Sequence, residues 1–295
     1  MRVLVTGASG LIGSHLLPAL QREGHQVVRL GRRAGAADFL WDPLRGELDR
    51  RALEGVEAVV HLAGESIGRR WTAARRERIW RSRVEGARLL AAAVASAASP
   101  PATFLSASAV GYYGDRGAEV LDEESGPGWG FLADLCRAWE EAARAAAQAG
   151  SRVVNARFGI VLSARGGALA QMLPLFRLGL GGTVGDGRQY LSWVDIEDAV
   201  AALLFLLSQG ELAGPVNVTS PNPVTNQQFT RTLARVLGRP AFLRVPAFAL
   251  RLLLGQMADE TLLSGQRVLP RKLQGAGFQF RYPELEGALR HLLGR

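Results

Sequence analysis

The sequence predicts an α/β fold: a doubly wound parallel sheet of about seven strands with a small, mainly helical C-terminal lobe. Short apolar runs alternate with helical patterns through the first half of the chain, as in βαβ units. These runs are continuously apolar, which is typical of strands covered on both faces. The 295 residues, 48% of them hydrophobic, are enough for one large domain and a lobe.

The elements of the first half follow one another closely. The first strand is Arg2–Val5, and a helix over Leu11–Glu23 follows it. Strands over Gln26–Leu30 and Ala58–Leu62 lead to a long helix over Trp71–Ser96, which ends before a proline pair. The remaining elements of this half are strands at Thr103–Ser106 and Arg152–Leu162, with a helix at Phe131–Gln148 between them.

Beyond Leu162 the pattern becomes irregular and rich in glycine. We expect residues 1–220 to form the first domain, which contains the sheet, with an excursion into the lobe near 163–192. Residues 221–295 would form the rest of the lobe, with a ligand in the crevice between the two parts. The elements expected here are helices at 168–178, 196–207, 226–237, 246–254 and 284–293, and a strand at 216–218.

The strongest motif is a glycine-rich turn between the first strand and the first helix. Gly7 and Gly10 let the backbone approach a pyrophosphate, and Gly13 allows the helix to pack closely on the strand. The helix amides would face the phosphates, as in a Rossmann dinucleotide-binding domain. A tight turn that binds nothing is the alternative. The predicted cofactor contacts in this turn are Gly7, Ser9, Gly10, Leu11, Ile12 and Gly13.

The end of the second strand favours NADP(H) over NAD(H). Sites that prefer NAD place an acidic residue here, which binds the ribose hydroxyls. This chain has Gly31, Arg32 and Arg33 instead, and its next acid is Asp38. Arginines suit a 2′-phosphate because they bind it bidentately. The alternative is a pair of solvated turn arginines in an arginine-rich chain.

The composition of the chain limits the classes of partner that we expect. The net charge of +8 invites a nucleic-acid interpretation, but the arginines are scattered and form no basic tail, so we expect no nucleic-acid partner. No apolar run is long enough for a membrane span, and a strand starts at Arg2, so we expect no membrane partner, no signal peptide and a cytoplasmic protein. The single cysteine, Cys136, is expected to be a buried apolar residue, and no metal site is predicted.

Three motifs together resemble the extended short-chain dehydrogenase/reductases, which include nucleotide-sugar epimerases and dehydratases. They are the turn from Thr6 to Gly13, the strand end His61-Leu62-Ala63-Gly64 and the segment from Ser106 to Tyr112. Further segments resemble an atypical branch, usually labelled epimerase-family protein and sometimes cell-division-inhibitor homologue. These are Gly64-Glu65-Ser66-Ile67, Arg70-Trp71, Ser82-Arg83, Phe131-Leu132 to Trp139-Glu140, and residues 265–270 and 277–280.

The resemblance extends over essentially the whole chain and implies further cofactor contacts. NADP(H) would lie along the carboxyl edge of a parallel sheet, with Leu62, Ala63 and Gly64 beside the ribose. Arg83 stands where many relatives have an asparagine that faces the cofactor. Relatives also dimerise through the two long helices, which predicts a homodimer. The remaining contacts implied near the nicotinamide are Ser106, Phe158 and Val161.

The usual catalytic pair of this family is missing. Family enzymes use a tyrosine and, four residues later, a lysine that lowers the tyrosine pKa. The corresponding helix here reads Phe131-Leu132-Ala133-Asp134-Leu135-Cys136, and the only lysine is Lys272. Ser108 matches the serine that binds substrate in the family. The remaining candidates are Tyr112 and Tyr113 as proton donors, and Glu65 and Ser66 as substrate contacts.

Two functions follow from these residues. The first is an NADP(H)-dependent oxidoreductase or epimerase-like enzyme that acts on an unidentified small polar or sugar-nucleotide-like molecule. The second is a non-catalytic NADP(H)-binding sensor or regulatory protein, which the missing pair favours. An enclosed cleft lined by Ser108, Tyr112 and Glu65 would favour the enzyme, and an open or plugged cleft would favour the sensor.

Overall fold

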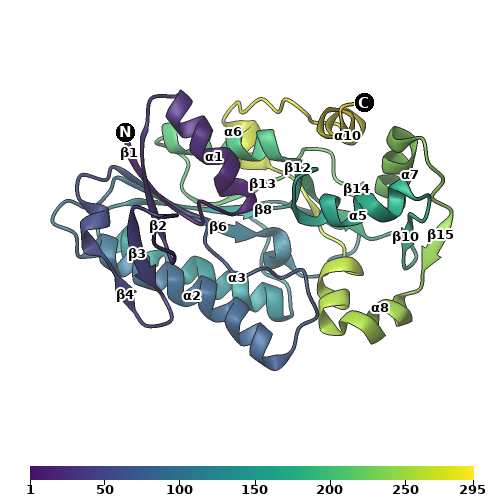
Figure 1. The fold of residues 1–295 in the computed structure, drawn as a ribbon, viewed down its shortest axis with the longest axis horizontal. Helices are drawn as coiled ribbons and strands as arrows, with labels where there is room; N and C mark the ends of the chain where they lie inside the picture. Colours follow the sequence, from purple (N-terminus) through teal and green to yellow (C-terminus); the bar gives the residue numbers. More distant parts are fainter.

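One eight-stranded sheet organises the structure, a computed structural model that describes residues 1–295 (Figure 1). Its strand order is β13-β8-β6-β5-β1-β2-β3-β4, and every neighbouring pair is parallel except β3 with β4. The predicted doubly wound sheet of seven parallel strands is therefore confirmed, with a short antiparallel strand, β4 (Glu47–Leu48), added at one edge. The parallel strands are β1 (Arg2–Thr6), β2 (Gln26–Gly31), β3 (Phe39–Asp42), β5 (Ala58–His61), β6 (Thr103–Ala109), β8 (Arg152–Phe158) and β13 (Gly214–Val218).

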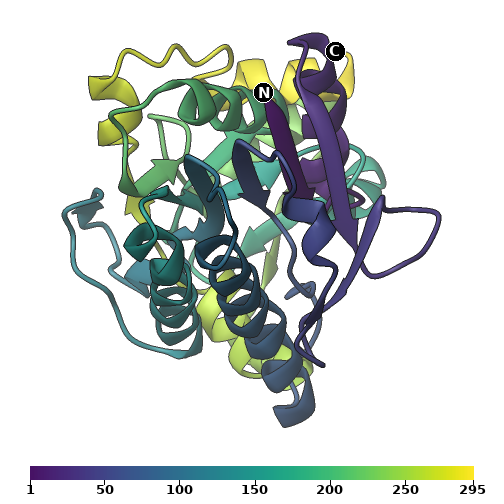
Figure 2. The ribbon, with the colours of Figure 1, turned by 90° about the vertical axis from the view of Figure 1, so that its left-hand side faces the viewer.

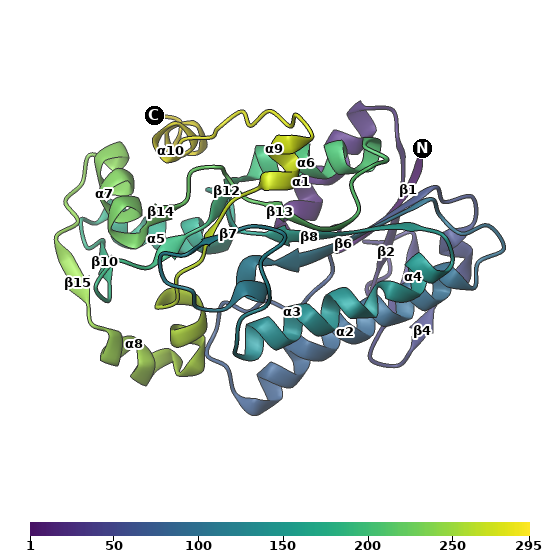
Figure 3. The ribbon, with the colours of Figure 1, turned by 180° about the vertical axis from the view of Figure 1, so that it is seen from behind.

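Helices cover both faces of this sheet, as expected for parallel strands made mostly of apolar residues. Helices α1 (Leu11–Arg22) and α6 (Ile196–Ser208) lie on one face (Figures 1 and 3). Helices α2 (Ala73–Ala95), α3 (Phe131–Ala142) and α4 (Arg144–Gln148) cover the other face, where α2 and α3 run side by side (Figure 2). Two buried apolar clusters, of 31 and 15 residues, fill these layers.

Two predicted elements differ from the structure, and one of the seven parallel strands was missed. The strand expected over Arg152–Leu162 divides at Gly159, where a Cβ would lie 2.5 Å from the carbonyl oxygen of Ser192. After this close approach, β9 (Ile160–Leu162) leaves the main sheet and pairs with β12 (Trp193–Asp195). The helix expected over 131–148 is interrupted at Ala143, whose N–H binds the i−3 carbonyl of Glu140. Strand β3 was not predicted.

The lobe has its own apolar core of 12 buried residues. It brings together α5 (Gly167–Arg177), α7 (Asn226–Leu237) and α10 (Leu285–Leu293), so segments on both sides of residue 220 share it. Helix α8 (Ala247–Leu254) lies apart and contains no buried residue. The smaller elements are β7 (Val120–Leu121), β10 (Gly182–Val184), β11 (Tyr190–Leu191), β14 (Val224–Thr225), β15 (Leu243–Val245), β16 (Arg267–Val268), α9 (Arg271–Gly275), the 3-10 helices η1 (Arg50–Leu53) and η2 (Val110–Tyr113) and the π-helix η3 (Ala258–Leu262).

Parts of the C-terminal segment return to the first domain. Leu273 and Phe278 join the main core, and the Asp198 carboxylate accepts the backbone N–H groups of Arg281 and Tyr282 at 2.8 and 2.9 Å. The exact division of the chain at residue 220 stays a prediction. No helix of the structure combines the length and the apolar character needed to cross a membrane.

The lobe also caps a helix of the first domain. The carboxylate of Glu260, in η3, accepts the N–H groups of Phe131 and Leu132 at 3.1 and 2.8 Å. These amides belong to the first turn of α3, where Gly130 offers no side chain to cap the helix. A carboxylate distant in sequence therefore accepts the free N–H groups at the amino terminus of α3.

Candidate cofactor site

The glycine turn between β1 and α1 is closed tightly enough to exclude other residues. Gly7 has φ +68°, and a Cβ there would lie 2.6 Å from the carbonyl carbon of Leu62. A Cβ on Gly13 would lie 2.3 Å from the carbonyl oxygen of Gly7. The N–H of Gly10 binds that same oxygen at 2.9 Å. The backbone therefore needs glycine at these positions, and it leaves the first amides of α1 open for a phosphate.

A buried hydrogen-bond network fixes the neighbouring strand end. The Thr6 hydroxyl oxygen accepts the N–H groups of Leu62 and Ala63, both at 3.2 Å. Its own proton is therefore donated to Nδ1 of His61, 2.7 Å away. His61 is consequently neutral, with its proton on Nε2, and its ring meets Trp41 edge-on at 5.8 Å. His61 thus positions the backbone of residues 62 and 63 rather than performing chemistry.

Burial makes this histidine an acid-sensitive point of the fold. Burial, together with the charge of Arg83, lowers the pKa of His61 from 6.5 to about 4. A base with a lowered folded-state pKa stabilises the fold above the unfolded pKa, and that contribution is lost as the pH falls through the folded pKa. We expect the free energy of unfolding to fall by about 3 kcal/mol between pH 7 and pH 4 on account of His61.

Urea unfolding across this pH range measures the effect. In His61→Gln the corresponding part of the pH dependence should vanish, because glutamine does not titrate. His15→Gln, which changes a histidine of α1, serves as the control and should keep the full dependence. An unchanged slope in His61→Gln would contradict this assignment.

A cavity of about 380 Å³ lies where β1, β2 and β5 end. It places nine of the predicted cofactor contacts and one predicted substrate contact around one space. Sequence reasoning missed Trp41, Leu44, Arg78 and Ser82, because the first two belong to the unpredicted β3 region and the others lie on α2, outside the motifs at the strand ends. The predicted residues that line the cavity are Gly7, Ser9, Gly10, Gly31, Arg32, Arg33, Leu62, Ala63, Gly64 and Glu65.

The charges around this cavity suit a dianion. Asp38, the first acid after β2, accepts the backbone N–H of Arg29 at 2.8 Å and its guanidinium at 2.6 Å. These bonds to Arg29 hold the pKa of Asp38 below its ordinary value, so the carboxylate stays charged and occupied. Arg32 and Arg33 are exposed and form no ion pair. The cavity therefore offers free guanidinium groups and no free carboxylate at the end of β2.

The remaining predicted cofactor contacts do not line this cavity. Arg83 is directed at the strand end, since its guanidinium donates to the Glu65 carbonyl at 2.9 Å and would lie 3.1 Å from a Cβ on Gly64. Burial lowers the pKa of Arg83. Ser106 is buried in the middle of β6, Phe158 is buried at the end of β8, and Val161 is half-buried in β9. Leu11 faces the outer side of the turn, where its side chain approaches Gly166 and Gly167.

The candidate catalytic residues belong to a buried polar network. Ser108 donates to the Glu140 carboxylate at 2.6 Å, and Glu140 forms a bidentate ion pair with Arg157, with both N···O distances 2.8 Å. Although burial opposes it, the bonds to Glu140 raise the pKa of Arg157. Arg157 also donates to the Tyr113 hydroxyl at 3.0 Å, which in turn donates to Asn217 at 2.8 Å. Ser108 thus faces a protein carboxylate.

The two tyrosines differ in their burial and in their contacts with this network. Tyr113 is fully buried, and burial raises its pKa to about 12, so its hydroxyl stays neutral and out of reach of a ligand. Tyr112 is half-buried, its ring lies 3.5 Å from the Arg157 guanidinium carbon, and its hydroxyl binds no protein group. Cys136 is buried, and burial raises its thiol pKa to about 12. Of these residues, only Tyr112 keeps a free polar group.

The two candidate substrate contacts are held by α2. The Glu65 carboxylate lies 3.6 Å from Arg75, whose guanidinium also donates to the Ser66 carbonyl at 2.7 Å. Glu65 lines the cavity at the end of β2, whereas Ser108 turns to Glu140 and Tyr112 stacks on Arg157. The side chains of Ser108, Tyr112 and Glu65, which would line a common cleft in an enzyme, therefore each have different surroundings.

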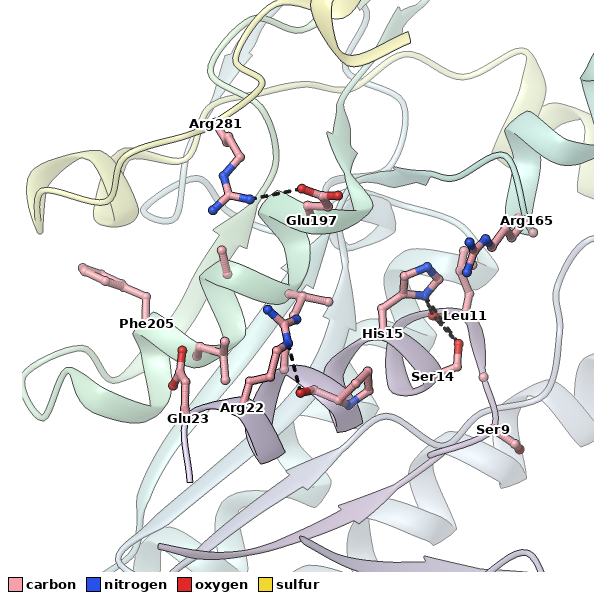
Figure 4. Close-up of a pocket in the computed structure, with 18 of the residues that line it drawn as sticks. Ser9, Leu11, Ser14, His15, Arg22, Glu23, Arg165, Glu197, Phe205 and Arg281 are labelled. Carbon is pink, nitrogen blue, oxygen red and sulfur yellow. Dashed lines mark hydrogen bonds and ion pairs between the residues drawn. The ribbon is translucent and has the colours of Figure 1, made fainter. Parts of the chain in front are cut away.

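A larger cavity of about 1180 Å³ lies on the other side of the glycine turn (Figure 4). Helices α1 and α6 form its walls, and the Glu197–Arg281 ion pair, 3.2 Å long, borders it. Nδ1 of His15 donates to the Leu11 carbonyl, 2.8 Å away. The cavity shares Ser9 and Gly10 with the turn but does not include Ser108 or Tyr112. No predicted substrate residue lies in it.

Comparison with known proteins gives consistent matches. Residues 3–219 match the NAD dependent epimerase/dehydratase family, and residues 245–292 match a domain of unknown function, DUF1731. An epimerase family protein of Mycobacterium tuberculosis is 49% identical over 97% of this chain and 96% of its own length. The crystal structure of human epimerase family protein SDR39U1 (isoform 2) with NADPH is 36% identical, with a TM-score of 0.92 over all of both chains. A nucleoside-diphosphate sugar epimerase structure from Corynebacterium glutamicum is 38% identical, with a TM-score of 0.81 over all of this chain and 58% of that one.

Proposed function

The chain belongs to the NAD dependent epimerase/dehydratase family, and we propose that it binds NADP(H) and acts as an oxidoreductase or epimerase-like enzyme. The substrate would be a small polar or sugar-nucleotide-like molecule. One observation carries the cofactor choice: Arg32 and Arg33 stand unpaired at the end of β2, while Arg29 occupies the carboxylate of Asp38, the first acid after this strand. The human relative, crystallised with NADPH, supports the same choice.

Different residues along the sheet edge would bind different parts of the cofactor. The amides of Leu11 and Ile12, in the first turn of α1, would hold the pyrophosphate, and Arg32 and Arg33 would hold the 2′-phosphate. When bound, the nicotinamide supplies the hydride chemistry. Phe158 and Val161 would border it and exclude water. Further predicted contacts are Gly7, Ser9, Gly10 and Gly13 at the glycine turn, and Arg83 and Ser106 along the rest of the sheet edge.

Tyr112 is the proton donor that fits best, because its hydroxyl is the free polar group near the network. Arg157, stacked on the Tyr112 ring at 3.5 Å, would hold this side chain in place. Ser108 would hold the reacting oxygen once it exchanges Glu140 for substrate. Glu65 and Ser66 would contact the substrate from the loop before α2.

A non-catalytic NADP(H) sensor is the second candidate. It is favoured by the hydroxyl groups of Ser108 and Tyr113, which the protein itself binds, and by the lack of a tyrosine–lysine pair on the helix that begins at Phe131. The homodimer stays a prediction. Trp80 and Phe131, on α2 and α3, line a shallow hollow on the outer face where a second copy would pack.

The cofactor proposal is tested by calorimetric titration with NADPH and NADH. Arg32→Ala should weaken NADPH binding by about 10- to 100-fold, because one charge-assisted phosphate contact is worth about 1.5–3 kcal/mol. NADH binding should hardly change. Arg50→Ala, a nearby surface arginine outside the cavity, is the matched control. Equal affinities for the two cofactors in the natural chain would contradict the proposal.

An activity assay on the same preparation distinguishes the enzyme hypothesis from the sensor hypothesis. The protein is mixed with NADP⁺ or NADPH and a panel of sugar nucleotides, and nicotinamide absorbance and substrate isomerisation are followed. Turnover that Tyr112→Phe removes would support the enzyme. Tight NADPH binding without turnover of any panel member would favour the sensor.

A further inference from the structure

Exposed apolar side chains gather on the lobe. Of the 13 large hydrophobic residues that are exposed in the chain, eight lie in two lobe segments, 167–185 and 226–256. Phe242, Phe248 and Leu252 are 78%, 72% and 75% exposed. The eight residues, called the apolar lobe surface below, are Leu175, Leu178, Leu180, Phe242, Leu243, Phe248, Leu252 and Leu253.

The two segments lie together in the fold. Strand β10 pairs in parallel with β15, with Gly182 opposite Leu243, so Leu180 and Phe242 precede paired strand ends. A Cβ on Gly179 would lie 3.3 Å from Pro240, which joins the segments again just before these strands. Helix α8 begins two residues after β15 and continues along the same end of the molecule (Figures 1 and 3).

Helix α8 is the most unusual part of this surface. Its sequence, AFALRLLL, contains one charged residue, yet none of its eight residues is buried. Phe248 and Leu252 are four residues apart and share one side of the helix, and Leu253 follows Leu252 directly. An apolar helix in this position loses hydrophobic stabilisation unless something covers it.

The charge around these residues has a single sign. The two lobe segments contain six arginines and no aspartate or glutamate. Acids from neighbouring elements pair with two of the arginines, Asp259 with Arg251 and Glu286 with Arg235. The other four are exposed and form no ion pair: Arg177, Arg231, Arg239 and Arg244. Exposed leucine and phenylalanine flanked by arginine is the pattern of helices that lie in a lipid interface.

We propose that the apolar lobe surface binds the surface of an anionic lipid bilayer. Phe248, Leu252 and Leu253 would enter the boundary between headgroups and acyl chains, while the arginines contact lipid phosphates. A second copy of this chain fits less well, because a symmetric contact would bring the unpaired arginines of both copies together. The expectation of no membrane partner rested on the missing span, and a helix that lies on a membrane does not need one.

Sedimentation with vesicles tests the proposal. The natural chain should sediment with vesicles of equal parts phosphatidylglycerol and phosphatidylcholine, and much less with pure phosphatidylcholine. The double variant Leu252→Asp/Leu253→Asp should reduce partitioning at least about tenfold, because each buried leucine contributes about 1.5–3 kcal/mol. Arg244→Glu should reduce it at least about fivefold, since one basic residue near the surface is worth about 1 kcal/mol.

Two controls keep the result specific. Leu40→Asp changes an exposed leucine of β3, at the opposite end of the sheet, and Arg88→Glu changes an exposed arginine of α2. Both should leave partitioning unchanged, and circular dichroism should show that all variants fold. No sedimentation with the anionic vesicles would overturn the proposal. So would a dimer mass that the Leu252→Asp/Leu253→Asp variant abolishes, because that result assigns the surface to a second copy.

Discussion

Alanine in place of Gly13 is expected to abolish cofactor binding. Its Cβ would lie 2.3 Å from the Gly7 oxygen and 2.9 Å from the Ala8 Cα, and both of these atoms belong to the backbone. Neither can rotate away, so the turn must open and α1 must move off the strand. We expect NADPH affinity to fall more than about 100-fold and stability to fall by about 3 kcal/mol, the upper end for an overpacked site.

A second glycine provides the control for this prediction. Gly287 lies in the exposed part of α10, and a Cβ there would meet no atom within 4 Å. Gly287→Ala should leave NADPH binding unchanged and stabilise the protein by about 1 kcal/mol, the usual helix preference for alanine. Titration calorimetry and urea unfolding measure both effects. If Gly13→Ala binds NADPH normally, the turn is not the phosphate site.

Removing the charge of Glu140 should destabilise the fold by about 3–5 kcal/mol, which is typical when one partner of a buried ion pair is lost. Glu140→Gln leaves the Arg157 guanidinium, only 3% exposed, without its carboxylate. The change also disturbs Ser108 and, through Arg157, both tyrosines. Urea unfolding at pH 7 measures the loss.

The adjacent residue offers a matched control. Glu141 pairs with Arg144 at 3.1 Å, but both side chains are about two-thirds exposed. Glu141→Gln should therefore cost less than about 1 kcal/mol. A double variant, Glu140→Leu with Arg157→Met, should recover much of the lost stability, because it leaves no unpaired buried charge. Similar losses in Glu140→Gln and Glu141→Gln would show that the network does not stabilise the fold.

The parts of the fold that local sequence determines were predictable. The turn from Gly7 to Gly13 depends on three glycines within seven residues, and the apolar strands depend on their own composition. Strand β3 was missed because it has only four residues and a short glycine- and alanine-rich segment precedes it. The division of the strand at Gly159 could not be predicted, because its cause is the Ser192 carbonyl, 33 residues later.

The site shows the same division. The cavity residues follow from the turn and from the ends of β2 and β5, all close in sequence to recognisable patterns. The surroundings of Ser108 could not be predicted, because its partner Glu140 lies 32 residues away on α3 and the guanidinium behind it comes from β8. A serine that matches a family motif can therefore have its hydroxyl bound within the protein.

The Glu260 cap on α3 makes the lobe and the first domain parts of one mechanical unit. Lifting η3 would expose the amides of Phe131 and Leu132, and losing a cap of this kind costs about 1 kcal/mol. The start of α3 would therefore fray whenever the lobe rotated outward. A ligand that keeps the lobe in place would also keep the first turn of α3, beside Tyr112, ordered. Binding at the lobe would therefore change the order of residues at the sheet edge.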